Sequence, residues 1–207
     1  GIVPIYPLTD KISQKQLRKI IKNVFDSYLK DIEEYLPEFI LKENNFQNLN
    51  KQDGHLNALK KVLREIGDLT DIKVIGHRIV HGGDEFCQPT IVNEKVIQEI
   101  KEFANEAPLH NPYELKVLLA TKEYFPDTIE VAVFDTAFFT TLPDKAKIYA
   151  IPLKYYQQGI QRFGFHGISH QYVAKKAAEK MKRKFSTINL ITCHLGGGCS
   201  IAAIAKG

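Results

Sequence analysis

The sequence predicts an α/β fold, and three observations lead to that prediction. Apolar runs typical of strands alternate with segments whose apolar residues recur at helical spacing. Polar residues and glycines directly follow several strand-like runs, at the positions where open α/β sheets place their sites. The 207 residues are 44% hydrophobic and 25% charged, which is ordinary for a water-soluble globular protein. Strands that alternate with helices pack as layers of helix against sheet.

The first 50 residues differ from the rest of the chain. Ser13 can cap a helix in which apolar residues recur at helical spacing from Leu17 to Leu29. Basic residues cluster in this stretch, although the net charge of the whole chain is only +4. The composition changes sharply near Asn50, so we expect residues 1–51 to form an α-helical extension.

From residue 52 onward, helices and strands are predicted to alternate. In order, we expect a helix over about 56–66, a strand within 72–83, a helix over 94–102 and a further helix that ends at about 124. A strand within 129–138 follows, and then a turn-rich region through 152. The chain is expected to end with a helix over 171–181 and a hairpin of strands 189–195 and 200–205. Ser169 is the natural N-cap of the helix that begins at 171. No run approaches the roughly 20 apolar residues that a membrane helix needs, and no signal-peptide pattern opens the chain.

Two polar residues stand out in the first half of this region. Arg78 lies within an apolar strand pattern, and an unpaired buried guanidinium is very costly. It must therefore meet an anion, which is either a bound ligand or a structural partner such as an Asp or Glu. His110 lies between two prolines in a rigid loop before a helix, where it either approaches a ligand or is an ordinary surface histidine.

Two further candidates follow in the second half. Asp135 comes directly after four apolar residues, at the carboxyl end of a strand, where a carboxylate either supports metal or proton chemistry or caps a turn with Thr136. His166 precedes Gly167 at a junction that leads into a helix. A histidine on such a turn either approaches a ligand closely or packs in the core.

The final hairpin carries three consecutive glycines at its tip. Such a tip exposes backbone N–H groups that can hold a phosphate, although a tight hairpin alone also explains it. Cys193 and Cys199 could face each other across the hairpin, but reduced thiols are expected for three cysteines without C-x-x-C spacing. The histidine pairs at spacing four (His77 with His81, His166 with His170) do not favour zinc, because neither pair lies on an uninterrupted helix.

Taken together, these stretches resemble the acetate/propionate kinase family from about Gly54 to Gly207. The matching pieces occur in that family's order and spacing: "GHRIVHGG", "APLHNP", "VFDTAFFTTLP", "YAIPLKYY", "RFGFHGISHQYVAKKAAE" and "ITCHLGGGCSIAAI". The resemblance implies an incomplete ribonuclease-H-like domain of the acetate-and-sugar-kinase/actin superfamily over residues 52–188. Residues 189–207 would be the first hairpin of a second domain.

The resemblance also implies roles for individual residues. Arg78 would bind the carboxylate or phosphoryl group, with His110 nearby. Asp135 would be the catalytic carboxylate, and His166 would stabilise the transferring phosphoryl group. The ATP phosphate loop would consist of five consecutive residues, His194, Leu195, Gly196, Gly197 and Gly198.

The sequence departs from the family at several points. Gly197 stands where the family usually has Asn, and Phe139 replaces a usual His. The family's N-terminal strand, its metal-binding Glu, a second-domain Arg and the adenosine pocket are not found, so we expect truncation at both ends. Residues 1–50 resemble instead the end of the wedge domain of RecG-type DNA helicases, which suggests a fusion.

We therefore expect an acetate kinase fragment that transfers a phosphoryl group between ATP and acetate, or another short carboxylate. Mg²⁺ is expected to arrive with ATP, and no residue of this chain is assigned to it. The family also implies a cytoplasmic protein and a homodimer, without membrane or nucleic-acid partners. Two alternatives remain, a non-catalytic phosphate binder and a nucleic-acid-binding module in residues 1–50. The isolated chain is expected to be inactive.

Overall fold

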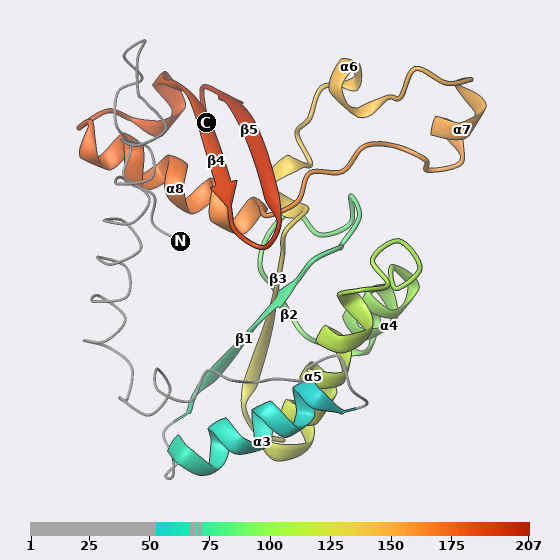
Figure 1. Ribbon diagram of the computed structural model, residues 1–207, viewed down its shortest axis with the longest axis vertical. Helices are drawn as coiled ribbons and strands as arrows, with labels where there is room; N and C mark the ends of the chain where they lie inside the picture. Colours follow the sequence, from blue (N-terminus) through green and yellow to red (C-terminus); the bar gives the residue numbers. More distant parts are fainter. Residues whose placement is uncertain (1–52, 67–68, 70–71) are drawn as a thin grey trace.

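The computed structural model describes residues 53–66, 69 and 72–207 (Figure 1). The helix expected after Ser13, and the separate extension over residues 1–51, lie outside the described residues. Within the described part of the chain, no helix has the length and apolar character needed to cross a membrane.

A three-stranded sheet lies at the centre of the molecule (Figure 1). Strand β1 (Val74–Ile79) pairs in parallel with β3 (Ile129–Phe134), and the short β2 (Thr90–Ile91) pairs antiparallel with the other edge of β3. The register places Arg78 opposite Val133 and Ile79 opposite Phe134. Because β1 and β3 are parallel, their carboxyl ends meet at one edge of the sheet, where the sequence predicts the site.

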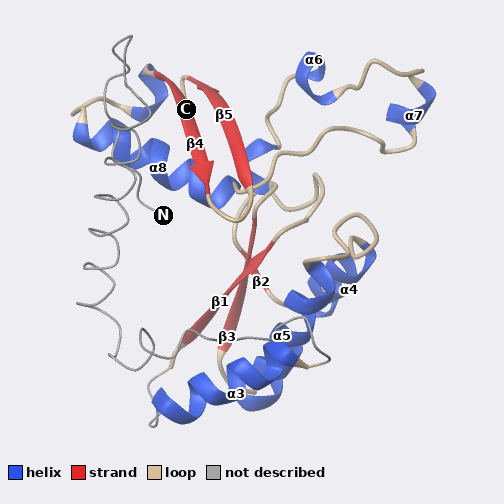
Figure 2. Ribbon diagram, viewed as in Figure 1, coloured by secondary structure: helices blue, strands red, loops and turns tan. Residues whose placement is uncertain are grey.

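Three helices pack beside this sheet: α3 (Gly54–Ile66), α4 (Glu94–Glu102) and α5 (Asn111–Tyr124) (Figure 2). The core between sheet and helices is formed by seven buried apolar residues, Ile79, Phe86, Val96, Ile100, Leu118, Ala132 and Phe134. These residues recur at period two along the strands and at helical spacing along α4, which is the pattern that predicted the elements. The α/β prediction is thus confirmed.

After β3 the chain passes through a one-turn 3-10 helix, η1 (Ala137–Phe139), and an arm that carries the short helices α6 (Asp144–Lys147) and α7 (Lys154–Gln157). It returns in α8 (Gly167–Lys180), followed by η2 (Phe185–Thr187) and the antiparallel hairpin of β4 (Asn189–Leu195) and β5 (Cys199–Ala205). Helix α8 packs against β4, so the hairpin and this helix form a second layer (Figure 2).

The prediction that Ser169 caps a helix starting at 171 is wrong. Helix α8 begins at Gly167, and the capping residue is His166 in the left-handed conformation, with φ 56° and no side-chain cap. The Gly167 N–H donates to the backbone oxygen of Asp135 at 3.0 Å, and a Cβ at Gly167 would lie 2.1 Å from that oxygen. Close contact between a glycine and the end of β3 therefore fixes where the helix starts.

The hairpin register keeps its cysteines apart. Cys193 is opposite Ile201 and Cys199 is opposite Leu195. All three cysteines of the chain, Cys87, Cys193 and Cys199, are free thiols. A disulfide across the hairpin is therefore not formed.

Asn111 anchors the loop that carries His110. It is fully buried, accepts a hydrogen bond from the His81 N–H at 3.1 Å and donates to the backbone oxygens of His81 at 3.0 Å and Ile100 at 3.3 Å. One side chain thus joins the segment after β1, the end of α4 and the first turn of α5.

We predict that Asn111→Ala lowers the free energy of unfolding by about 2–4 kcal/mol. A buried N–H and two buried carbonyl groups would lose a partner, and each unsatisfied group costs about 1–3 kcal/mol before the structure relaxes. Urea unfolding followed by circular dichroism measures the change. The matched control is Asn93→Ala, which removes only the side-chain cap of α4, an acceptor for the Val96 N–H. A loss of about 1 kcal/mol is expected there, and a loss no larger for Asn111→Ala would contradict the prediction.

Candidate active site

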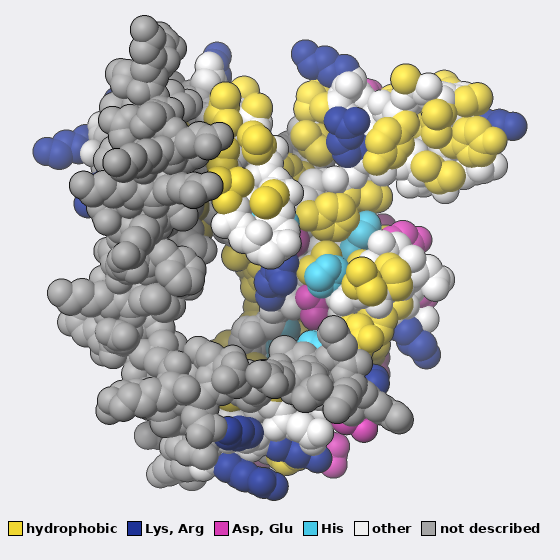
Figure 3. Space-filling view, in the orientation of Figure 1, with side chains coloured by type: hydrophobic (Ala, Val, Ile, Leu, Met, Phe, Trp, Pro, Cys, Tyr) yellow, Lys and Arg dark blue, Asp and Glu magenta, His cyan; other side chains and the backbone are white. Residues whose placement is uncertain are grey.

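The site lies where β1 and β3 end. Arg78 comes from β1 and Asp135 directly follows β3. The Arg78 guanidinium donates twice to the Asp135 carboxylate, from Nε to Oδ1 at 3.2 Å and from Nη2 to Oδ2 at 2.6 Å. Figure 3 shows basic, acidic and histidine side chains gathered on this face, below the hairpin. The sequence predicts an anionic partner for Arg78, and in the structure this partner is the Asp135 carboxylate of the same chain.

The expectation that Arg78 is buried is wrong, because its side chain keeps 50% of its surface exposed while that of Asp135 keeps 1%. The reason is strand alternation: the neighbouring Ile79 points into the core, so Arg78 points to the opposite face. The outer side of the guanidinium therefore remains open to an anionic ligand while its inner side is held by Asp135.

Asp135 makes bonds in three further directions. Its Oδ2 accepts the backbone N–H of His166 at 3.1 Å, its backbone oxygen accepts the Gly167 N–H, and its own N–H donates to the Ile79 oxygen at 2.8 Å. The alternative that Asp135 merely caps a turn with Thr136 does not describe these contacts. Thr136 instead accepts the Gly82 N–H on its own hydroxyl at 3.1 Å.

His166 and His194 face each other beside the glycine tip. Their rings stack with centroids 4.0 Å apart. The Nδ1 of His166 lies 2.8 Å from the Ser200 hydroxyl, and the Nδ1 of His194 lies 2.9 Å from the Ser169 hydroxyl. Burial lowers the pKa of His194, and the neighbouring His166 ring lowers it further. The pair thus favours a neutral His194 imidazole near neutral pH.

The glycine tip is open and close to His166. The Gly196 N–H is used within the turn, since it donates to the Gly198 oxygen at 3.0 Å. Within the described residues, and apart from its two chain neighbours, no atom lies within 4 Å of the position that a Cβ at Gly197 would take, whereas a Cβ at Gly198 would lie 3.2 Å from the His166 ring. Gly198 therefore leaves the space beside His166 free, and the substitution of the family's Asn by Gly197 lies at the exposed apex.

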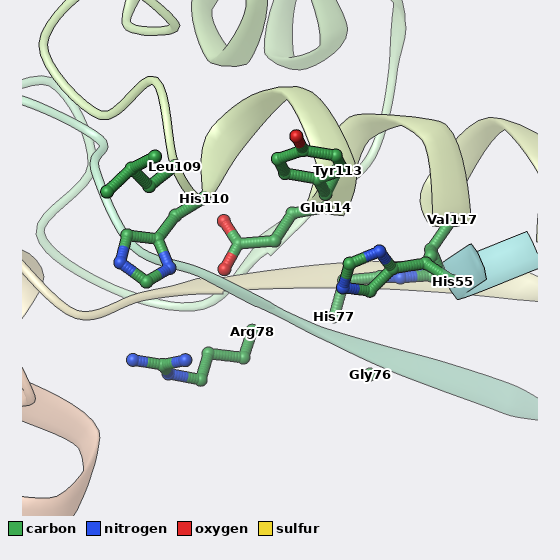
Figure 4. A pocket seen from close by; sticks show the side chains of 9 residues that line it. All are labelled: His55, Gly76, His77, Arg78, Leu109, His110, Tyr113, Glu114 and Val117. Carbon is green, nitrogen blue, oxygen red and sulfur yellow. The ribbon is translucent and has the colours of Figure 1, made fainter. Parts of the chain in front are cut away.

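Arg78 lines a pocket of about 380 Å³ (Figure 4). His110 from the start of α5 and Arg78 from β1 both line it, so the structure brings these two predicted residues to one cavity. Glu114 lines the same cavity and accepts the Val80 N–H at 2.9 Å. Burial raises the pKa of Glu114.

Sequence reasoning missed Glu114, Thr192 and Ser200. Glu114 belongs to an ordinary helical pattern and gives no signal of its own. Thr192 and Ser200 lie on the hairpin strands and bond to histidines, with Thr192 Oγ1 2.7 Å from His170 Nδ1 and Ser200 Oγ 2.8 Å from His170 Nε2. A buried hydroxyl in a strand pattern is a usable signal, because it needs a partner.

The chain matches the model of the acetokinase family over residues 13–207. The chain belongs to the acetokinase family. Acetate kinase of Trichormus variabilis is 49% identical over 142 residues, which cover 69% of this chain and 35% of the relative. Acetate kinase of Carboxydothermus hydrogenoformans is 44% identical over 176 residues, or 82% of this chain and 44% of the relative.

Two solved members of the acetokinase family share its fold. The crystal structure of Porphyromonas gingivalis acetate kinase matches with a TM-score of 0.69 and 38% identity, over 73% of this chain and 40% of that one. A propionate kinase from Francisella tularensis matches with a TM-score of 0.67 and 38% identity, over 75% and 40% of the two chains. The prediction of a partial acetate-and-sugar-kinase/actin fold is confirmed.

The acetokinase match also bears on the extent of the chain. The chain spans 35 to 45% of the length of the curated relatives it matches. The family model begins at residue 13, within the segment that resembles a helicase wedge domain. These matches give no support to the helicase resemblance, and the domain division at residues 51 and 188 stays a prediction.

We predict that the acetokinase chain loses stability as the pH falls below neutral. Burial lowers the pKa of four histidines, His77, His81, His170 and His194. Above the unfolded-state pKa of about 6.5 both states are neutral at these rings. Below it the unfolded chain takes up protons that the folded chain resists, so stability is lost as the pH falls towards the folded pKa values.

Urea midpoints measured from pH 8 to pH 5 test this expectation. His81→Gln is the informative variant, because His81 is 2% exposed and lies among three phenylalanine rings. It should flatten the dependence on pH. A midpoint that stays constant or rises on acidification would refute the prediction.

Proposed function

We propose that this chain forms the acyl- and phosphoryl-binding part of an ATP-dependent carboxylate kinase, with acetate as the substrate. The single observation that carries the proposal is the Arg78–Asp135–His166 arrangement at the carboxyl edge of the parallel strands. It presents a half-exposed guanidinium and an imidazole on one face, next to a pocket that also contains His110. The relatives also support this proposal, because acetate kinases match the chain at 42–49% identity.

Phosphoryl transfer to a carboxylate suits these residue types. An acetate oxygen would form a bond to the γ-phosphorus of ATP as the bond from that phosphorus to the bridging oxygen breaks, and ADP leaves with the electron pair. The carboxylate is already ionised, so no base is needed to remove a proton. What the reaction needs is alignment and neutralisation of the charge on the phosphoryl oxygens.

Arg78 is proposed to supply the positive charge. Two of its N–H groups are held by Asp135, which fixes the plane of the guanidinium, and its exposed side can contact a carboxylate or phosphoryl oxygen. Asp135 therefore acts in this proposal as the group that orients Arg78 and the His166 turn. Its side chain is 1% exposed, which suits an orienting role.

His166, His194 and the glycine tip are proposed to surround the phosphoryl group. His166 would donate from Nε2 into the space that Gly198 leaves free, and His194 to Gly198 would contribute backbone N–H groups to the ATP phosphates. The Gly196 N–H is directed into its own turn, so Gly197 and Gly198 are the better donors. His110 would contact the acyl substrate from the pocket wall.

Magnesium is proposed to arrive with ATP. Mg²⁺ keeps several waters and is usually bound by one or two carboxylates together with substrate phosphates. The residues that the structure describes contain no group of three metal-ligating side chains. A nucleotide-borne ion would neutralise charge on the phosphates. We further propose a cytoplasmic homodimer, in keeping with ATP use and three free thiols.

We predict that a chimera in which residues 54–207 replace the matching segment of Porphyromonas gingivalis acetate kinase forms acetyl phosphate from ATP and acetate. In that chimera Arg78→Ala and His166→Ala should each lower turnover about a hundredfold. The loss of one group that stabilises transition-state charge costs on the order of 3 kcal/mol. Trapping of acetyl phosphate as the hydroxamate measures the rate.

Lys176→Ala is the matched control for these variants. Lys176 is exposed on α8, and its ion pair in the described part of the chain is a local one with Glu179, so its loss should leave turnover unchanged. Full activity in both Arg78→Ala and His166→Ala would show that the roles are assigned wrongly. A folded chimera that binds phosphate but forms no hydroxamate would favour the non-catalytic phosphate binder.

A second prediction concerns the 207-residue chain alone. It should bind magnesium-ATP only weakly and show no acetate-dependent ADP formation. Backbone N–H groups alone hold phosphate poorly in competition with water, and most of the length of the matched relatives has no counterpart here. Isothermal titration and a coupled ADP assay measure both quantities. Micromolar affinity or steady turnover would contradict this expectation.

A further inference from the structure

Four side chains form a continuous row of hydrogen bonds from the hairpin to His166. Thr192 Oγ1 lies 2.7 Å from His170 Nδ1, and His170 Nε2 lies 2.8 Å from Ser200 Oγ. Ser200 Oγ in turn lies 2.8 Å from His166 Nδ1. We name this row, Thr192–His170–Ser200–His166, the hydroxyl–imidazole row. It crosses three elements, because Thr192 is on β4, Ser200 is on β5 and His170 is on α8.

The direction of these hydrogen bonds follows from the buried end of the row. Thr192 is 3% exposed, and the partner that the described structure shows for its hydroxyl is His170 Nδ1. A buried hydroxyl proton without an acceptor is costly, so Thr192 donates and His170 Nδ1 carries no proton. Burial lowers the pKa of His170, whose side chain is 1% exposed, so its ring is neutral and its single proton is on Nε2.

Ser200 transmits this direction to His166. Its hydroxyl accepts the proton-bearing Nε2 of His170, and it has only one proton of its own to donate. That proton goes to His166 Nδ1, the other atom at 2.8 Å. A neutral His166 then bears its proton on Nε2. Nε2 belongs to the ring edge that faces Gly198, where a Cβ would lie 3.2 Å from Cε1 and 3.3 Å from Nε2.

We propose that the hydroxyl–imidazole row holds His166 as a neutral hydrogen-bond donor whose Nε2–H points into the space beside the glycine tip. Ser200, His170 and Thr192 are positioning residues in this account, and Ser200 contacts His166 directly. The proposal rests on the proposed function for the identity of the acceptor, a phosphoryl oxygen. The direction of the row itself does not depend on it.

The groups around His166 also fix its position. Its ring stacks on His194 with centroids 4.0 Å apart, and its backbone N–H is held by Asp135 Oδ2 at 3.1 Å. The Arg78 guanidinium is hydrogen-bonded to the same Asp135 carboxylate and supplies the positive charge of the site. A donor of fixed direction next to one cation suits phosphoryl oxygens, which accept hydrogen bonds from preorganised groups.

The test is the protonation of the two rings in the 207-residue chain, measured by long-range ¹H–¹⁵N NMR at pH 7.5. In the wild-type chain, His166 and His170 should each show a single tautomer with the proton on Nε2. In Thr192→Val the row loses its directing donor, and both rings should lose the single tautomer. Thr192→Ser keeps the hydroxyl and should restore it.

Thr192 does not touch His166. A change in the His166 tautomer on Thr192→Val would therefore not be expected if Thr192 had a merely structural role. Ser169→Ala is the matched control: it removes the hydroxyl next to His194 and should leave the His166 tautomer unchanged. Ser200→Ala should abolish the single tautomer of His166 even where Thr192→Val fails to fold, and Ser200→Thr should preserve it.

Either of two results would overturn the proposal: a wild-type His166 with its proton on Nδ1, or a folded Ser200→Ala chain whose His166 tautomer is unchanged. Titration with inorganic phosphate, carried to concentrations that fill even a weak site, then separates this inference from the proposed function. A fixed Nε2–H whose resonance does not respond to phosphate would support the row and count against the phosphoryl contact.

Discussion

The buried carboxylate of Asp135 is the constraint on which the rest of the site depends. It holds the Arg78 guanidinium through two hydrogen bonds and the His166 turn through a third, while its backbone ties β3 to β1 and to the start of α8. Because the Asp135 carboxylate is buried, losing the Arg78 guanidinium would leave its charge without its main partner, although the half-exposed guanidinium is itself screened by solvent. The positions of Arg78 and His166 therefore depend on each other, because both residues are hydrogen-bonded to the same carboxylate at the end of β3.

The second constraint on the site is that neighbouring atoms pack closely against two glycines, Gly164 and Gly167. A Cβ at Gly167 would meet the Asp135 oxygen, and a Cβ at Gly164 would lie 2.1 Å from the Phe139 ring. Phe139, which stands where the family usually has His, also makes an edge contact with the His170 ring at 5.9 Å. Phe139 thus belongs to the apolar support beneath the histidines.

Much of the architecture was predictable from periodicity alone, because β3 and α4 bury their apolar residues at the spacing that defines a strand and a helix. The candidate site was predictable as a set of residues at strand ends, but not as a set of contacts. No local pattern indicates that Arg78 pairs with Asp135, 57 positions away, or that Glu114 bonds to Val80. The start of α8 was predicted wrongly because Ser169 is a good capping residue by local chemistry. Tertiary contact at Gly167 overrides that preference, and Ser169 binds His194 instead.

The hydrogen bonds between α8 and the hairpin cross the domain boundary that the family resemblance implies at residue 188. His166 bonds to Ser200, His170 to Thr192 and to Ser200, and Ser169 to His194. Drawing the hairpin away from α8 would leave two buried polar side chains, His170 and Thr192, without these partners, each at about 1–3 kcal/mol. The glycine tip and His166 must then move together, as one unit with α8. The glycine tip would therefore keep its register with the histidine that faces it.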